Sequence, residues 1–114
     1  MKNIKTEEIQ QLINIFETMI EATEHLQKQI RDKQFSHALK MFTSIVEGLT
    51  ELDPVVKQLD NEQLSNEKRK LDHAALLIAK ELENQTDLKI LEIIQFNLLP
   101  TLNKILALFI EQLN

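Results

Sequence analysis

The side chains best suited to bind a metal ion are the three histidines of the chain, His25, His37 and His73. Di-iron helical bundles hold their metals through Glu-x-x-His motifs on facing helices. The residues three positions before these histidines are Ala22, Gln34 and Lys70, so the motif is missing each time. No two histidines are spaced to bind zinc from one turn of a helix. We therefore expect no metal site and expect the histidines to lie at the surface or at the boundary of the core.

Nucleophilic catalysis lacks its usual residues as well. The chain has no cysteine, which excludes thiolate chemistry and disulfides, and no base is positioned near Ser36, Ser44 or Ser65. One glycine cannot build a phosphate-binding loop. Trp and Tyr are absent, and Phe occurs only within apolar stripes, so stacking platforms for bases or sugars are lacking. We predict that the protein is not an enzyme and uses no cofactor.

The charge of the chain argues against nucleic acid as a partner. The formal net charge is −5 and the pI is about 5.2, whereas phosphate backbones need a basic face. The one basic cluster is Lys68-Arg69-Lys70, and we interpret it as the solvated flank of a helix.

Composition indicates an all-α protein. One Gly and two Pro in 114 residues leave few turn-forming residues, and sheets need many turns. Abundant Leu, Ile, Glu, Lys and Gln favours long helices. The length is typical of one domain, so we assign residues 1–114 to a single helical-bundle domain.

No targeting or membrane-spanning segment is expected. Acidic Glu7 and Glu8 precede any apolar run, unlike a signal peptide, and no uninterrupted apolar stretch of about 18 residues is present. We therefore predict a cytoplasmic location.

Apolar residues at helical spacing predict four amphipathic helices. Their expected ranges are 6–31, 33–59 with a kink or break at Pro54, 60–83, and 87–113 with a kink or break at Pro100. Thr6, Asp32 and Asp60 are the expected N-caps, and Asp60 with Gln63 approximates a capping box. Short connections favour antiparallel neighbours, so an up-down four-helix bundle is predicted. Gly48 lies inside the second predicted helix and indicates either a close approach of two helices or simple tolerance of a glycine there.

The fourth helix is apolar on nearly every side. Lys89, Glu92, Lys104 and Glu111 are its charged residues. A helix of this kind must be buried nearly all round. Either it is central and wrapped by the other three helices, or a second copy or another protein covers its outer face. The residues we expect at such an interface are Ile90, Ile93, Phe96, Leu99, Leu106, Leu108 and Ile110.

Two resemblances add to these expectations. The richness in Lys, Asn, Ile and Glu, with four helices, resembles small uncharacterised helical proteins of low-GC Gram-positive bacteria. The chain is also similar, more loosely, to flagellar export chaperones, which are small acidic cytosolic bundles that hold a partner helix on a helical surface. That similarity implies a binding role but transfers no binding residues, because no chaperone motif matches residue by residue.

Three functions remain open at this point. The first is a non-enzymatic module for protein–protein interaction or self-association through the fourth helix, so a protein partner or a homo-oligomer is expected. The second is a chaperone or anti-regulator that binds an amphipathic helix of a partner in a groove. The third is a small-molecule sensor with a pocket between helices near Pro100.

Overall fold

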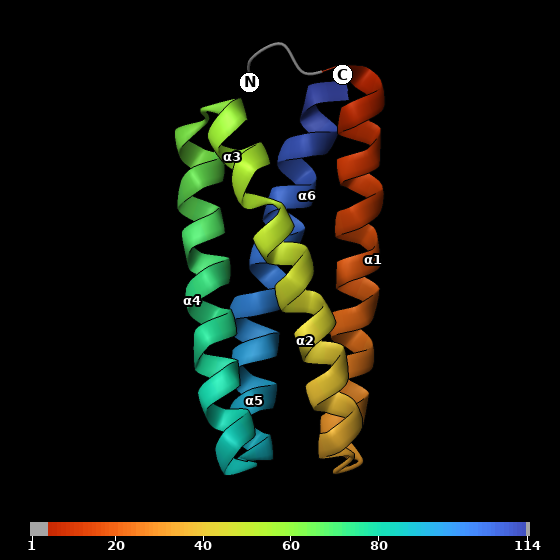
Figure 1. Ribbon diagram of the computed structural model, residues 1–114, viewed down its shortest axis with the longest axis vertical. Coiled ribbons are helices and arrows are strands. Elements are labelled where there is room, and N and C mark those ends of the chain that lie inside the picture. Colours follow the sequence, from red (N-terminus) through yellow and green to blue (C-terminus); the bar gives the residue numbers. More distant parts are fainter. Residues whose placement is uncertain (1–4, 114) are drawn as a thin grey trace.

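Four long helical segments run alternately up and down in the computed structural model, which describes residues 5–113 (Figure 1). In chain order they are α1 (Thr6–Arg31), α2 (Phe35–Glu51) continued by α3 (Asp53–Leu59), α4 (Glu62–Asn84), and a fourth segment made of α5 (Asp87–Ile93), η1 (Ile94–Leu98) and α6 (Leu99–Leu113). The bundle measures 44 × 21 × 20 Å. The predicted all-α four-helix bundle is confirmed.

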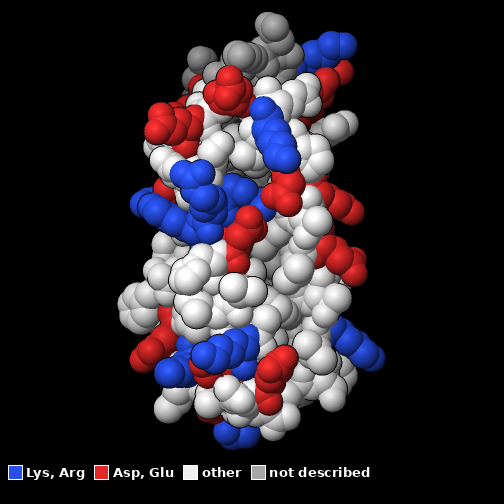
Figure 2. Space-filling view, turned by 60° about the vertical axis from the view of Figure 1, so that its left-hand side comes forward, with Lys and Arg blue, Asp and Glu red and all other residues white. Residues whose placement is uncertain are grey.

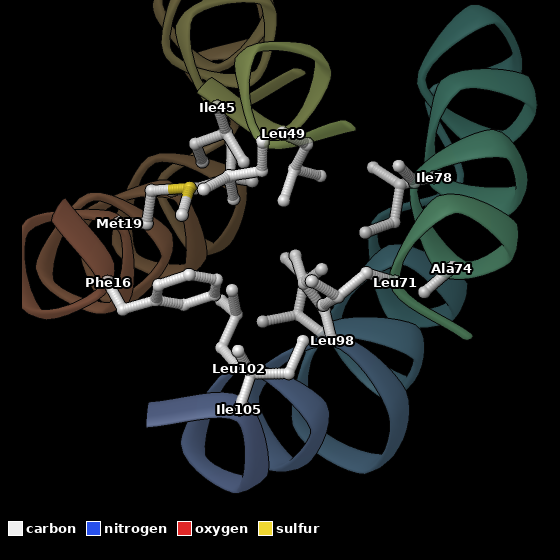
Figure 3. Packing of buried hydrophobic residues seen from close by; sticks show 14 of the residues in the cluster. Phe16, Met19, Ile45, Leu49, Leu71, Ala74, Ile78, Leu98, Leu102 and Ile105 are labelled. Carbon is white, nitrogen blue, oxygen red and sulfur yellow. The ribbon is translucent and has the colours of Figure 1, made fainter. Parts of the chain in front are cut away.

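Each segment packs on two neighbours. The fourth segment lies against α1 and α4, and α2 lies against the same two helices from the opposite side. Side chains from all four segments point toward one centre (Figure 3). The residues that Figure 3 labels in this core are Phe16, Met19, Ile45, Leu49, Leu71, Ala74, Ile78, Leu98, Leu102 and Ile105.

The predicted N-caps are wrong. Lys5, not Thr6, precedes α1, and Asp32 ends α1 instead of capping α2. Asn61, not Asp60, caps α4, and its side-chain oxygen accepts a 3.0 Å hydrogen bond from the backbone N–H three residues on. As a result α2 and α4 begin at Phe35 and Glu62, two residues later than predicted.

Left-handed residues at the connections explain this displacement. Lys33, Asp60 and Gln85 have φ angles of 58°, 49° and 52°. Helices often end with a left-handed residue, most often glycine. An N-cap needs an extended backbone, as at Asn61 with φ −111° and ψ 119°. Asp60 ends α3 in the left-handed conformation, so it cannot also begin α4.

The two prolines interrupt their helices in different ways. Near Pro54 the helix is interrupted only at Leu52, and Pro54 itself is exposed. At Pro100 the helix does not break. Instead the preceding turn widens into the π-helix η1, in which the Leu99 N–H donates to the Ile94 carbonyl five residues back. Pro100 lacks an N–H for the carbonyl four residues before it, and a π-turn accommodates such a defect in the ladder.

Gly48 lies where α1 and α2 approach closely. A Cβ atom added there would meet the Met19 sulfur at 3.3 Å, which is tighter than ordinary van der Waals contact. The close approach, one of the two alternatives at Gly48, is therefore present, and Met19 is the residue that fills the space.

A buried cation joins α3 to α4. The Lys68 side chain is 6% exposed, and its Nζ lies 2.6 Å from Asp53 and 2.7 Å from Asp72. Burial alone would lower the Lys68 pKa, but hydrogen bonds to the two carboxylates and their charges outweigh it and hold the pKa above its usual value. Lys68 thus belongs to the fold and does not extend a solvated basic flank.

The raised pKa makes a prediction about stability at alkaline pH. The folded state holds the Lys68 proton more tightly than the unfolded chain does. The contribution of the ion pairs is therefore fully present below the unfolded pKa of about 10.4 and is lost as pH rises through the higher folded pKa. Urea unfolding of wild type and Lys68→Met between pH 9 and pH 12 should show the wild type losing about 1 kcal/mol relative to the variant. Parallel pH profiles for the two proteins would contradict the expectation.

Candidate binding surfaces on both sides of helix α4

The residues predicted for an interface on the fourth helix do not form one surface. Ile90 is 0% exposed and lies in the core, so its assignment to the outer surface is wrong. Phe96 and Ile110 are exposed, at 67% and 44%. The others are partly buried and pack against the core, and they are Ile93, Leu99, Leu106 and Leu108.

Two neighbouring helices cover most of the apolar surface of the fourth segment. Its inner stripe is buried and consists of Ile90, Ile94, Leu98, Leu102, Ile105 and Phe109. The partly buried residues flank this stripe, while α1 and α4 provide the surfaces on which it packs. The exposed side is mainly polar, with Glu92, Gln95, Asn103 and Lys104 among its residues. The wide stripe predicted from the sequence therefore reflects packing on two helices at once.

The segment Asp87–Leu113 passes a simple test for a membrane-spanning helix. By length and composition alone it is apolar enough, with a mean hydropathy of 1.5 in its most apolar window, of which 39% is buried inside the bundle. Core helices of soluble proteins pass the same test, and the inner stripe of this segment is core. The prediction that the chain does not span a membrane stays a prediction.

An apolar groove runs between α2 and α4. One part encloses about 370 Å³, and an adjoining part toward the α4–α5 turn encloses about 330 Å³. The two parts share Leu39, Phe42 and Ala79. We call this feature the α2–α4 groove, and its further apolar lining is Phe35, Val46, Leu49, Ala75, Leu76 and Leu82.

Two leucines at the groove are exposed to an unusual extent. Leu39 on α2 is 55% exposed and Leu76 on α4 is 70% exposed. Figure 2, in which α4 faces the viewer, shows a broad uncharged area across the middle of this face, with charged side chains above and below it. Helical spacing alone puts Leu39 on the same apolar stripe as Phe42 and Val46, so it does not predict the exposure of Leu39. The available signal was that Leu76 and Leu77 fall outside the stripe formed by Leu71, Ala74, Ala75 and Ile78.

A second pocket lies on the opposite flank of α4, against η1 and the start of α6. It encloses about 740 Å³ and is lined by Pro100, so the structure has a pocket at the position expected from the sequence. We call it the η1 pocket. Its other main lining residues are Glu67, Arg69, Lys70, His73, Ala74, Leu77, Phe96, Thr101 and Lys104.

The residues considered for metal chemistry lie apart. His25, His37 and His73 are all exposed, as predicted. Within residues 5–113 no group of three His, Asp or Glu side chains is arranged to hold a metal ion. Whether the protein has an enzymatic activity is a separate question, and on that point the sequence-based prediction stays a prediction.

The fold and these two surfaces define an all-α four-helix bundle with an apolar groove and a mixed pocket beside one helix. Residues 7–107 match the model of a family described as a domain of unknown function (DUF8042), and the chain belongs to this family. No curated protein and no solved structure matches the chain. The resemblances to Gram-positive helical proteins and to flagellar chaperones therefore stay predictions.

Proposed function

We propose that this protein is a non-enzymatic interaction module that binds an amphipathic helix of a partner protein in the α2–α4 groove. The observation that carries the proposal is the groove itself, whose walls are apolar and whose rims hold the exposed Leu39 and Leu76. A large apolar side chain exposed beside an apolar groove is typical of helix-in-groove recognition.

The length of the groove fits a helix of about four turns. Its lining extends from Phe35 to Thr50 on α2, and from Asp72 on α4 to Gln85, which directly follows α4. At a rise of 1.5 Å per residue, both walls are about 20 Å long. A bound helix of that length would place three or four apolar side chains, spaced i, i+3, i+4 and i+7, into the groove.

The charges at the groove favour a basic partner. Asp72 lies toward one end and Glu83 toward the other, and no Lys or Arg lines either part. Asp72 shares Lys68 with Asp53, so one cation faces two carboxylates there. A partner helix with Lys or Arg on both sides of its apolar stripe would match this pattern and would associate faster at low salt.

The outer face of the fourth segment supports an interaction less well. Its two exposed apolar interface candidates, Phe96 and Ile110, are separated by 14 helical positions, or about 21 Å along the axis, and polar residues such as Asn103 and Lys104 lie between them. Single exposed apolar residues are ordinary on protein surfaces. We therefore assign partner binding to the α2–α4 groove and not to the fourth helix.

A model peptide and a matched pair of variants test the proposal. The probe is a fluorescein-labelled helical peptide of about 18 residues, with leucines at groove spacing, alanine and glutamine elsewhere, and two lysines at each end. We expect saturable binding by fluorescence anisotropy. Leu76→Asp should weaken it by about 30-fold or more, since it removes a large apolar contact and places a carboxylate against the apolar side of the peptide, at a cost of about 2 kcal/mol. The control is Leu88→Asp, because Leu88 is 76% exposed and lies outside the groove.

Several results would overturn the proposal. One is the absence of binding at peptide concentrations up to about 1 mM. Another is an equal effect of Leu76→Asp and Leu88→Asp. Light scattering on the protein alone gives the third, since a dimer that Leu76→Asp dissociates would mean that a second copy occupies the groove instead of a partner helix.

A further inference from the structure

The η1 pocket has a basic half and an apolar half. Arg69 on α4 and Lys104 on α6 lie at one end, and Leu77 on α4 and Phe96 on η1 lie at the other. In each wall the basic and the apolar residue are eight positions apart, or about 12 Å along the helix. α4 and the fourth segment run antiparallel (Figure 1). Counted from the turn at residues 85–86 that joins them, Arg69 and Lys104 lie 16 and 18 positions away, and Leu77 and Phe96 lie 8 and 10 positions away.

The basic half carries an excess of positive charge in an acidic protein. Arg69, Lys70 and Lys104 line the pocket, and Glu67 is its one carboxylate, so the lining has a net charge of +2 with His73 neutral. Figure 2 shows Lys and Arg side chains gathered on one side of the upper half of this face. Within residues 5–113, neither Arg69 nor Lys104 forms an ion pair with a carboxylate. Arg69 donates a hydrogen bond to the neutral amide oxygen of Asn66, which lines the same pocket, so the charges of both cations are not neutralised by a described carboxylate.

Glu67 positions the third cation from inside the bundle. The residue is 7% exposed, and its Oε2 atom accepts a 3.0 Å hydrogen bond from Lys70 Nζ, while the Lys70 side chain is 59% exposed. The other carboxylate oxygen, Oε1, is buried and has no hydrogen-bond partner within the described residues. A half-satisfied buried carboxylate is unfavourable for stability, and such departures from good packing are typical of functional sites.

The apolar half is formed beside the π-turn. Phe96 lies within η1 and is 67% exposed, and Leu77 opposite it is 37% exposed. π-turns within α-helices are rare and occur frequently at functional sites. An exposed aromatic ring and a leucine facing the same pocket provide an apolar contact next to the cations.

We infer that the η1 pocket binds a small amphipathic anion, with a carboxylate or phosphate group between Arg69 and Lys104 and an apolar body on Leu77 and Phe96. The volume of about 740 Å³ is within the range of small-molecule sites. Charge-assisted hydrogen bonds from Arg and Lys would hold the head group. This site lies on the opposite flank of α4 from the α2–α4 groove, and the inference does not rest on the proposed function.

The probes are octyl phosphate and octanoate, with octyltrimethylammonium as the oppositely charged control. Binding is followed by chemical-shift changes in ¹⁵N-labelled protein and by calorimetry. We expect saturable binding of both anions, with the largest shifts at pocket residues that do not line the groove, such as Lys70, His73 and Lys104. Octyltrimethylammonium should bind at least about tenfold more weakly, because the cations would repel it.

Two charge-reversal variants separate the pocket from general electrostatics. Lys104→Glu should weaken octyl phosphate binding by about tenfold or more, since it removes a charge-assisted contact and adds a repulsive one. Lys89→Glu changes the net charge equally at an exposed position outside the pocket and should change the affinity less than about twofold. Phe96→Ala should also weaken binding while leaving the melting temperature unchanged.

Four outcomes would overturn the inference. They are no saturable binding of either anion, equal effects of Lys104→Glu and Lys89→Glu, shifts that map to the α2–α4 groove, and equal binding of octyltrimethylammonium. A flotation assay with phosphatidylglycerol vesicles distinguishes the source of the anion. Binding to vesicles without binding of free octyl phosphate would assign the cations to a lipid surface and not to a small-molecule pocket.

Discussion

Ile90→Asp is expected to abolish folding of the domain. Ile90 is 0% exposed and begins the buried stripe of the fourth segment. An aspartate there would bury a charge without a partner, or would have to bind a proton, and either costs several kcal/mol in addition to the lost apolar burial. Because single domains are stable by only about 5–15 kcal/mol, we expect loss of the cooperative thermal transition in circular dichroism.

The matched control is Ile110→Asp, which makes the same change on the same helical segment. Ile110 is 44% exposed, so an aspartate introduced there would keep its carboxylate in water. We expect a cooperative transition with a stability change within about 1 kcal/mol. Both residues were assigned to one interface from the sequence. If Ile90→Asp folds as well as Ile110→Asp does, the burial of the fourth segment described above is wrong.

Phe109→Ala is expected to be among the most destabilising simple truncations. Phe109 is 1% exposed, and its ring packs against Phe16 of α1 with centroids 5.5 Å apart and an interplanar angle of 50°. Removing a buried phenyl ring and leaving a cavity costs about 3–5 kcal/mol. Urea denaturation followed by circular dichroism measures this loss as a lower unfolding midpoint.

Phe96→Ala and Phe16→Ala complete this experiment. Phe96 is 67% exposed on the same helical segment, so truncating it should change the free energy of unfolding by less than about 0.5 kcal/mol. A double-mutant cycle between Phe16 and Phe109 should give a coupling of about 0.5–1.5 kcal/mol, as expected for a tilted aromatic pair. Additive effects of the two truncations would mean that the rings do not contact each other in solution.

The fold class could be predicted because it depends on periodicity and on scarce turn residues. The helices predicted at 6–31 and 87–113 match the observed bounds, since long runs of helical spacing are unambiguous. The N-caps could not be predicted as well. At Asp60 and Asn61 two good capping residues are adjacent, and the left-handed backbone of Asp60, with φ 49°, decides between them.

The candidate surfaces were harder to predict than the fold. Leu39 and Phe42 are three positions apart, as neighbours on one helical stripe are, yet Leu39 is 55% exposed and Phe42 is 5% exposed. Periodicity shows which side of a helix is apolar, but it does not show how far away the neighbouring helix lies. The pocket at Pro100 was expected from the missing N–H donor, whereas the cations opposite Pro100 come from α4, far away in the sequence.

Helical spacing, scarce turn residues and short connections can all be recognised in the sequence, and together they predict four amphipathic helices in one antiparallel bundle. Which apolar residues are covered depends on the tertiary structure. Ile90 and Phe96 occur in one apolar helix, and their exposures of 0% and 67% differ because α1 and α4 cover one side of that helix and the π-turn shifts its phase. Apolar character is a property of a residue, whereas burial depends on the distance and direction of its neighbours.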